Sequence, residues 1–178
     1  MDVAMFDRVV QATGGVVGEI SSADFGGATP CADWTVRDLL NHLIGQYDMV
    51  AGRAAEDDYT SEDHAPAYYA ASVRARDAFA APGAMEKNFA MPWGETPGGA
   101  LLGLVIADTV VHGWDLARAT GQELAVDDDV AEAVYGMTSG MMEPKGDFPR
   151  GTAFAPPVEV PDDAPVRSKM LAYLGRRP

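Results

Sequence analysis

The chain has 178 residues, 47% of them hydrophobic, which is enough for one buried domain over residues 1–178 and excludes an intrinsically disordered protein. Its formal net charge of −14 argues against a nucleic-acid or anionic-membrane partner, because phosphate contacts need clustered Lys and Arg. No uninterrupted apolar run approaches a membrane span, no secretion signal opens the sequence, and the lone Cys31 indicates a reducing cytoplasm.

The first half of the chain contains two clear helical segments. Apolar residues at helical spacing predict a first helix over most of residues 3–22. After a loop, Thr35 can cap a second helix, and Asp38 stands where it would complete a capping box. This second helix is expected to run to about Ala54 and to be followed by a polar loop at residues 56–64.

Three further elements are expected in the middle of the chain. Pro66 can open a third helix that stops near Pro82. Residues 84–98 look like an irregular connection or a short hairpin, because Gly and Pro interrupt them. A long helix is predicted over residues 99–121, and a fifth over residues 127–142.

A short last helix is predicted over residues 165–174, and no internal repeat is present. The expected fold is therefore all-α: a four-helix bundle with extra short helices and an irregular or short β connection. We expect the irregular segments 55–66, 84–98 and 143–164 to shape the mouth of a pocket.

The long helix carries an unusual polar stripe. It is apolar almost all the way round except for Asp108, His112 and Asp115, which fall within roughly one-sixth of the helix circumference. A helix that is apolar on every side should be buried, and burying two carboxylates and an imidazole is costly unless each finds a partner. A metal ion is one such partner, and a hydrogen bond or salt bridge is another.

The spacing of Asp108 and His112 is suited to a metal, because residues four apart lie one above the other on a helix. A carboxylate and an imidazole together suit zinc, iron, nickel or manganese. A third ligand would come from another element, where His42 and His64 are the remaining histidines. Asp115 could ligate, accept a hydrogen bond from the imidazole or pair with a nearby Arg118, and we favour the supporting roles.

Other conspicuous residues have simpler interpretations. Cys31 is more simply a buried, inert cysteine than a reactive thiol. The side chains of Trp34, Trp93 and Trp114 are expected in the core rather than on a ligand platform. The acidic run at residues 127–129 is expected to begin a helix.

Two long segments resemble a known family. The run TPCADWTVRDLLNHL at residues 29–43 is similar to the N-terminal signature of the mycothiol-dependent maleylpyruvate isomerase-like proteins, within the wider DinB/YfiT-like superfamily of metal-binding bundles. The run DTVVHGWDLARATG at residues 108–121 is similar to the second signature. The ending of the chain resembles a small actinobacterial subgroup.

The resemblance implies a bundle that holds one divalent metal, commonly zinc or nickel, with mycothiol as a cosubstrate. By motif position the ligands would be His42, Asp108 and His112. Members of the family usually carry Glu where this chain has Asp108, and they carry a second, C-terminal domain for which this sequence has no room. We therefore do not infer maleylpyruvate isomerisation itself.

The leading hypothesis is a metal-dependent enzyme that uses a low-molecular-weight thiol, such as mycothiol, for S-transfer or isomerisation on a small electrophile. A metal-dependent hydrolase, a non-catalytic metal- or ligand-binding bundle, and a bundle without any metal are the alternatives. The expected partner is a small-molecule substrate, with neither nucleic acid nor membrane involved. A homodimer is an assembly that the sequence allows.

Overall fold

A computed structural model describes residues 1–56, 58–60, 63–142 and 154–178. Within these residues the elements follow one another as α1 (Val3–Gly18), α2 (Val36–Val50), α3 (His64–Ala80), β1 (Asn88–Met91), β2 (Gly94–Pro97), α4 (Gly98–Ala119), α5 (Asp128–Met142) and α6 (Val166–Tyr173). The chain is mainly helical with one two-stranded antiparallel hairpin, so the predicted all-α fold with a short β connection is confirmed.

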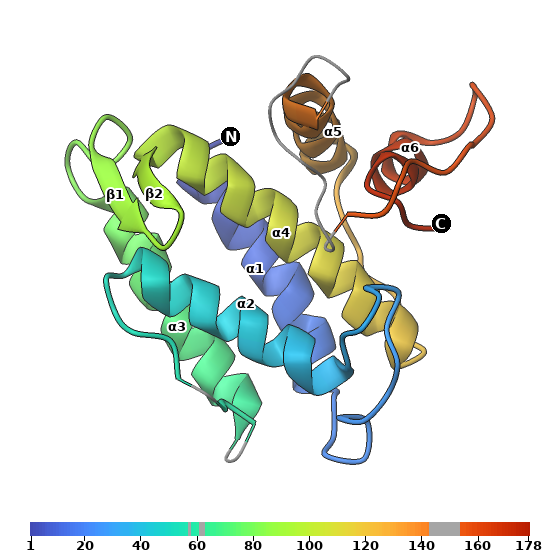
Figure 1. Ribbon diagram of the computed structural model, residues 1–178, viewed down its shortest axis with the longest axis horizontal. Helices are drawn as coiled ribbons and strands as arrows, with labels where there is room; N and C mark the ends of the chain where they lie inside the picture. The colour runs from blue at the N-terminus through green and yellow to red at the C-terminus, as the bar shows by residue number, and fades with distance from the viewer. Residues whose placement is uncertain (57, 61–62, 143–153) are drawn as a thin grey trace.

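The first four helices form the bundle (Figure 1). Helices α1 and α2 each contact both α3 and α4, so that α1 and α2 lie at opposite corners. One core joins the four helices, and a large, fully buried side chain comes from each: Phe6, Tyr47, Tyr68 and Leu102. The rings of Phe6 and Tyr47 meet edge to face at 5.8 Å, a favourable geometry for aromatic pairs.

Helix α4 is the most deeply buried helix of the bundle. By length and composition it could cross a membrane, but 78% of its apolar window is buried inside the protein, as in the core helix of a soluble protein. Its close packing against α1 depends on Gly113, where an added Cβ would lie 2.5 Å from Oγ1 of Thr13. Thr13 also donates a hydrogen bond to the carbonyl of Thr109, at 3.3 Å. The burial expected for this helix is therefore confirmed.

The start of α2 agrees with the sequence, whereas its end does not. Thr35 and Asp38 form the predicted capping box, each side chain accepting a hydrogen bond from the other residue's backbone N–H. The helix ends at Val50, four residues before the expected Ala54. Gly52 then adopts a φ of 73°, a left-handed conformation that turns the chain out of the helix.

Helix α3 begins two residues earlier than predicted, at His64 rather than Pro66. Asp63 caps it, its side chain accepting a hydrogen bond from the N–H of Ala65. His64 was expected in a polar loop, but it is 8% exposed and its Nε2 lies 3.2 Å from the carbonyl of Val17. The expectation was wrong because the packing of α3 against α1 buries this end of the helix.

Helices α5 and α6 pack on each other beside the bundle, on the right in Figure 1. Arg8 of α1 binds Asp127 and Asp129 at the start of α5, with N–O distances of 2.7 and 2.5 Å. Arg167 of α6 binds Asp128 at 2.9 Å. The acidic run at residues 127–129 therefore begins α5, as predicted, and also connects that helix to α1 and α6 by ion pairs.

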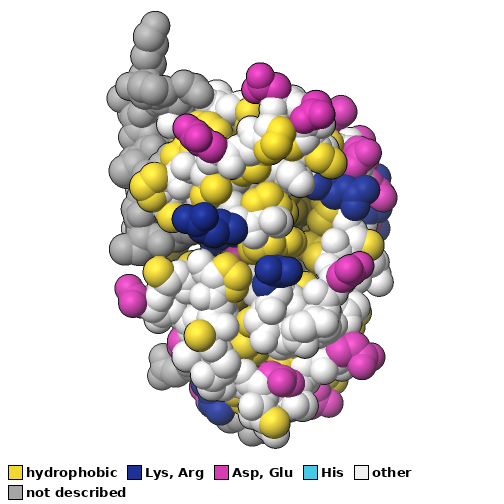
Figure 2. All heavy atoms as spheres, turned by 90° about the vertical axis from the view of Figure 1, so that its right-hand side faces the viewer, with side chains coloured by type: hydrophobic (Ala, Val, Ile, Leu, Met, Phe, Trp, Pro, Cys, Tyr) yellow, Lys and Arg dark blue, Asp and Glu magenta, His cyan; other side chains and the backbone are white. Residues whose placement is uncertain are grey.

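The side of the molecule that carries α5 and α6 is partly hydrophobic. Figure 2 shows apolar side chains around a hollow on this side, with Lys and Arg side chains at its border. A pocket of about 220 Å³ lies between α4 and α6, with Trp114, Arg118 and Arg167 in its walls. The three residues proposed as metal ligands do not line it.

Candidate metal centre

The three predicted metal ligands lie together between α2 and α4. His42 projects from α2, and its Nε2 lies 2.8 Å from Oδ2 of Asp108 on α4. One turn further along α4, Nε2 of His112 lies 3.3 Å from Oδ1 of the same carboxylate. One candidate ligand atom from each residue lies within 4.8 Å of the others. The fold therefore brings the i, i+4 pair Asp108 and His112 of α4 next to His42, which precedes Asp108 by 66 residues.

The Nε2 atom of His112 is buried and makes no hydrogen bond to any described residue. Its approach to Asp108 is close, but it lacks the geometry of a hydrogen bond. The other ring nitrogen, Nδ1, lies 3.1 Å from Oδ2 of Asp115. Leaving a buried polar atom unpaired costs about 1–3 kcal/mol, so this nitrogen is placed as a ligand atom would be.

Asp115 lies on the Nδ1 side of the His112 ring and forms an ion pair with Arg176, near the C-terminal end of the chain. Arg176 donates to it twice, from Nε to Oδ1 at 3.1 Å and from Nη2 to Oδ2 at 2.6 Å. Both side chains are buried, with exposed fractions of 0% for Asp115 and 2% for Arg176. The favoured supporting role of Asp115 agrees with this geometry, whereas the pairing with Arg118 does not occur: that guanidinium lies over the ring of Trp114.

Two supporting residues were missed by the sequence analysis. Arg176 follows Asp115 by 61 residues, and nothing local to either residue signals the contact. Gln46 lies one turn after His42, and its Nε2 donates to Oδ2 of Asp108 at 2.9 Å. The i, i+4 spacing from His42 could have indicated Gln46, because both side chains share one face of α2.

The tryptophans differ in their surroundings. Trp34 stacks on His112 with ring centroids 5.7 Å apart and meets His42 at 4.8 Å, so it forms one wall of the cluster. Trp93 was expected in the core, but it is 63% exposed. The hairpin explains the difference, because Trp93 lies in the turn between β1 and β2 rather than on a buried strand position.

Cys31 lies beside the same cluster. It is 2% exposed, and its sulfur lies within 4.8 Å of ligand atoms of His112 and Asp115. Burial raises the pKa of the Cys31 thiol, although the nearby Arg176 opposes that shift. A buried thiol that keeps its proton is a poor nucleophile, in agreement with the expectation of an inert cysteine.

The charges of the cluster are strongly coupled. Burial opposes ionisation of Asp108, but the His112 and His42 imidazoles hold the pKa of that carboxyl well below its usual range. Burial likewise lowers the pKa of His112, but the Asp108 and Asp115 carboxylates outweigh it and raise the pKa to about 9. The cluster without a metal therefore favours a protonated imidazole between two carboxylates, a position that a cation would fit.

The donor set fits a divalent transition metal. Two imidazole nitrogens and one carboxylate oxygen are the ligands of many zinc sites, and three protein ligands leave further coordination positions free. The Asp115 carboxylate behind His112 is the usual support for a ligating histidine, because it fixes the ring and leaves Nε2 to the metal. Nε2 of His112 is buried and makes no hydrogen bond although it lies 3.3 Å from the Asp108 carboxylate, and this observation favours a ligand role.

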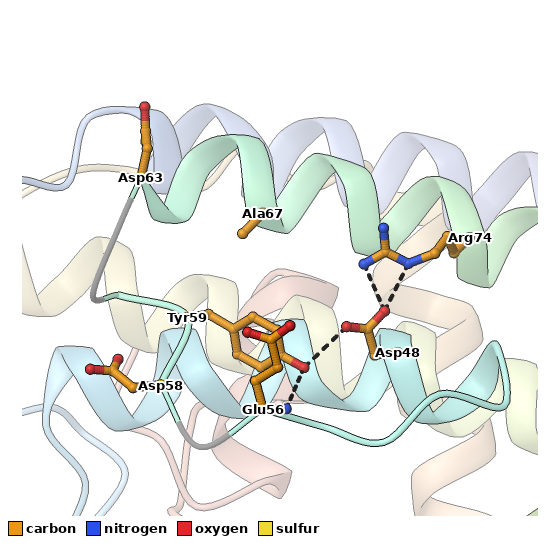
Figure 3. A pocket seen from close by; sticks show the side chains of 7 residues that line it. All are labelled: Asp48, Glu56, Asp58, Tyr59, Asp63, Ala67 and Arg74. Atoms are coloured by element: carbon orange, nitrogen blue, oxygen red, sulfur yellow. Dashed lines mark hydrogen bonds and ion pairs between the residues drawn. The ribbon is translucent and has the colours of Figure 1, made fainter.

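A second polar pocket, of about 300 Å³, lies between α2 and α3 (Figure 3). Asp48 is 1% exposed and faces Arg74 at 2.7 Å, and the Tyr59 hydroxyl donates to its other oxygen at 3.1 Å. Arg53 approaches the same carboxylate at 3.5 Å. The buried acid is thus fully paired, and its role is to connect α2, α3 and the segment after α2.

The pocket beside the metal cluster is larger, at about 480 Å³, and it reaches from His42 and Asp108 to the β-hairpin. Met91 and Trp93 line it, so the expected contribution of segment 84–98 is confirmed. Segment 55–66 instead lines the polar pocket of Figure 3. Of segment 143–164, residues 143–153 lie outside the described residues, and Phe154 lines the larger pocket.

Comparison with known proteins agrees with the resemblance seen in the two signatures. The family described as the mycothiol maleylpyruvate isomerase N-terminal domain matches residues 6–91, which include His42. Two uncharacterised proteins, from two strains of Mycobacterium tuberculosis, are each 34% identical over 172 residues, covering 95% of this chain and 94% of theirs. No solved structure matches. The chain belongs to the family of the mycothiol maleylpyruvate isomerase N-terminal domain.

Proposed function

We propose that this protein is a divalent-metal-dependent enzyme that uses a low-molecular-weight thiol, such as mycothiol, for S-transfer or isomerisation on a small electrophile. The observation that carries the proposal is the buried Nε2 of His112, which makes no hydrogen bond and faces Asp108 and His42 beside a large pocket. Membership in a mycothiol-related family supports the choice of thiol. Zinc or nickel is the expected metal, and the lone cysteine is in keeping with a cytoplasmic location.

Each side chain of the cluster has a distinct role. His42, Asp108 and His112 would hold the ion, which when bound would lower the pKa of a thiol and so supply a thiolate near neutral pH. Asp115 accepts a hydrogen bond from Nδ1 of His112 and thereby orients the ring so that Nε2 faces the ion. Gln46 holds the Asp108 carboxylate through Oδ2, and Trp34 covers the imidazoles on one side.

The first test is elemental analysis of the purified, tag-free protein beside the His42→Ala and His112→Ala variants. We expect close to one divalent ion per chain in the parent and loss of the ion in both variants, because each removes one of three ligands. His64→Gln is the matched control, since this third histidine is buried but lies on α3, outside the cluster. Absence of metal after reconstitution with zinc, nickel, manganese and iron would refute the proposal.

The second test follows thiol consumption by the metal-loaded protein against a panel of small electrophiles, with mycothiol and a surrogate thiol. Consumption that His112→Ala abolishes would support a thiol-dependent enzyme. Hydrolysis without added thiol would identify a metal-dependent hydrolase instead. Tight binding without turnover would identify a non-catalytic binding bundle.

A further inference from the structure

The walls of the 480 Å³ pocket beside the metal cluster consist mostly of apolar side chains. Residues from α2, the β-hairpin, α4 and α5 enclose it, and Leu101, Leu104 and Val105 of α4 lie along one wall. Five of the nine methionines of the chain also line it: Met49, Met91, Met137, Met141 and Met142. A volume of this size is within the usual range for pockets that bind small organic molecules.

The polar groups of the pocket are concentrated at one end. His42, Gln46 and Asp108 lie there, where α2 meets α4. Thr138 is also in the wall, but its hydroxyl donates to the carbonyl of Val134 at 2.8 Å and is therefore satisfied within α5. The pocket is thus apolar along its body and polar only beside the metal cluster.

No Lys or Arg side chain is among the described residues that line this pocket. A carboxylate or phosphate in the apolar part would lose its hydration without gaining a cation from these residues, which is strongly unfavourable. The described lining therefore favours an uncharged apolar compound over a dianionic one.

We infer that the site takes an uncharged, predominantly apolar small molecule, whose body lies among the methionine side chains and whose single polar end reaches His42 and Asp108. The inference names the electrophile class of the proposed function and rests on it. Methionine is unbranched and flexible, so a wall rich in methionine adapts to several related shapes. We expect a family of related apolar compounds to bind rather than one substrate alone.

The test compares two dyes that share one scaffold: the uncharged N-phenylnaphthylamine and its sulfonate, anilinonaphthalene sulfonate. We expect saturable binding of the uncharged dye, at least about tenfold tighter than binding of the sulfonate, because the described lining residues offer the sulfonate no cation. Met141→Lys adds a cation to the wall and should weaken the uncharged dye while strengthening the sulfonate. Met5→Lys, at a half-buried methionine of α1 that does not line the pocket, is the matched control.

The location of the dye is read from ¹³C-methyl methionine spectra. The uncharged dye should shift the methyl signals of Met49, Met91 and Met137 while leaving those of Met5 and Met85 in place. A shift at Met170 alone would place the dye in the pocket between α4 and α6 and would overturn the inference. Equal affinity for the two dyes in the parent protein would overturn it as well.

The dye titration is repeated on metal-free protein and on His112→Ala, which separates this inference from the proposed function. Binding of the uncharged dye by a protein that never takes up metal would uphold the apolar pocket and refute the metal-dependent enzyme. A protein that binds metal but prefers the sulfonate would uphold the enzyme and refute the apolar substrate class.

Discussion

The two ring nitrogens of His112 have different surroundings, and this difference gives the site its chemical character. Nδ1 faces Asp115, whereas Nε2 faces the opening between Asp108 and His42. The orientation depends on Asp115 staying in place, although it is fully buried. Arg176 supplies the compensating charge through two hydrogen bonds.

Replacing Arg176 tests this arrangement at the scale of a single residue. Arg176→Met keeps an unbranched apolar stem but leaves the Asp115 charge unpaired, which should lower the free energy of unfolding by about 3–5 kcal/mol. Urea denaturation of the metal-free protein measures the loss. Metal affinity should fall too, because the support behind His112 is weakened.

Arg177→Met is the control for that change, because Arg177 is the exposed neighbour of Arg176 and should have little effect. The double variant Asp115→Leu with Arg176→Met removes both charges of the ion pair. It should therefore regain part of the stability that Arg176→Met alone loses. If Arg176→Met unfolds at the same urea concentration as the parent, the pairing with Asp115 is not important for stability.

At the scale of the elements, the boundaries that local chemistry controls agree with the structure. The capping box of Thr35 and Asp38 begins α2, and the acidic run at residues 127–129 precedes α5. The start of α3 was missed although Asp63 caps it locally, and the buried position of His64 was missed because it depends on packing against α1. Local signals specify where a helix can begin, whereas neighbouring helices decide which of its residues are buried.

The contact between α1 and α4 leads to a prediction about Gly113. In Gly113→Ala the new Cβ would lie 2.5 Å from Oγ1 of Thr13, so the two helices must move apart. We expect a loss of about 1–3 kcal/mol, the usual cost of overpacking a core, and a lower thermal midpoint by calorimetry.

Gly15→Ala provides the matched comparison on the partner helix. Gly15 is exposed in α1, and an added Cβ would meet nothing within 4 Å. Alanine should therefore stabilise the helix by roughly 0.5–1 kcal/mol relative to glycine. Equal effects of the two substitutions would contradict the close packing of α1 on α4.

At the scale of the whole molecule, the candidate metal centre is a site suited to a cation within a strongly acidic protein. The net charge is −14, and Asp108 and Asp115 place two carboxylates beside His112. Without a metal, the protonated His112 supplies the positive charge between them. Its pKa of about 9, against 6.5 for a free imidazole, makes the stability of the metal-free protein depend on pH.

The sign of that dependence follows from the raised pKa. The stabilisation from protonated His112 is complete below pH 6.5 and is lost as pH rises through about 9. We expect the metal-free protein to lose on the order of 3 kcal/mol over this range, since one pKa unit corresponds to about 1.4 kcal/mol. Urea denaturation at several pH values, after removal of metal by a chelator, measures the change.

His112→Gln separates this effect from general charge repulsion, which grows with pH in parent and variant alike. The variant should show a smaller fall in stability between neutral and alkaline pH. The metal-loaded parent should also resist the fall, because a bound ion replaces the proton as the compensating charge. Identical pH profiles for the parent and His112→Gln would rule out the coupling.

The sequence by itself determined the helical fold, the burial of α4 and the candidate ligands. Period and capping are local properties, and the i, i+4 spacing places Asp108 and His112 on one face of a helix wherever that helix packs. For the third ligand the residues alone left His42, on a predicted helix, and His64, in a predicted loop, and the resemblance to a known family selected His42.

Only the tertiary structure decided what surrounds those ligands. The pairing of Arg176 with Asp115, the stacking of Trp34 on His112 and the methionine-lined pocket each join elements that are far apart in the chain. Such contacts depend on how the helices pack and on the charge that burial leaves to be compensated. No local pattern encodes that packing, because each residue's partner is chosen by the fold as a whole.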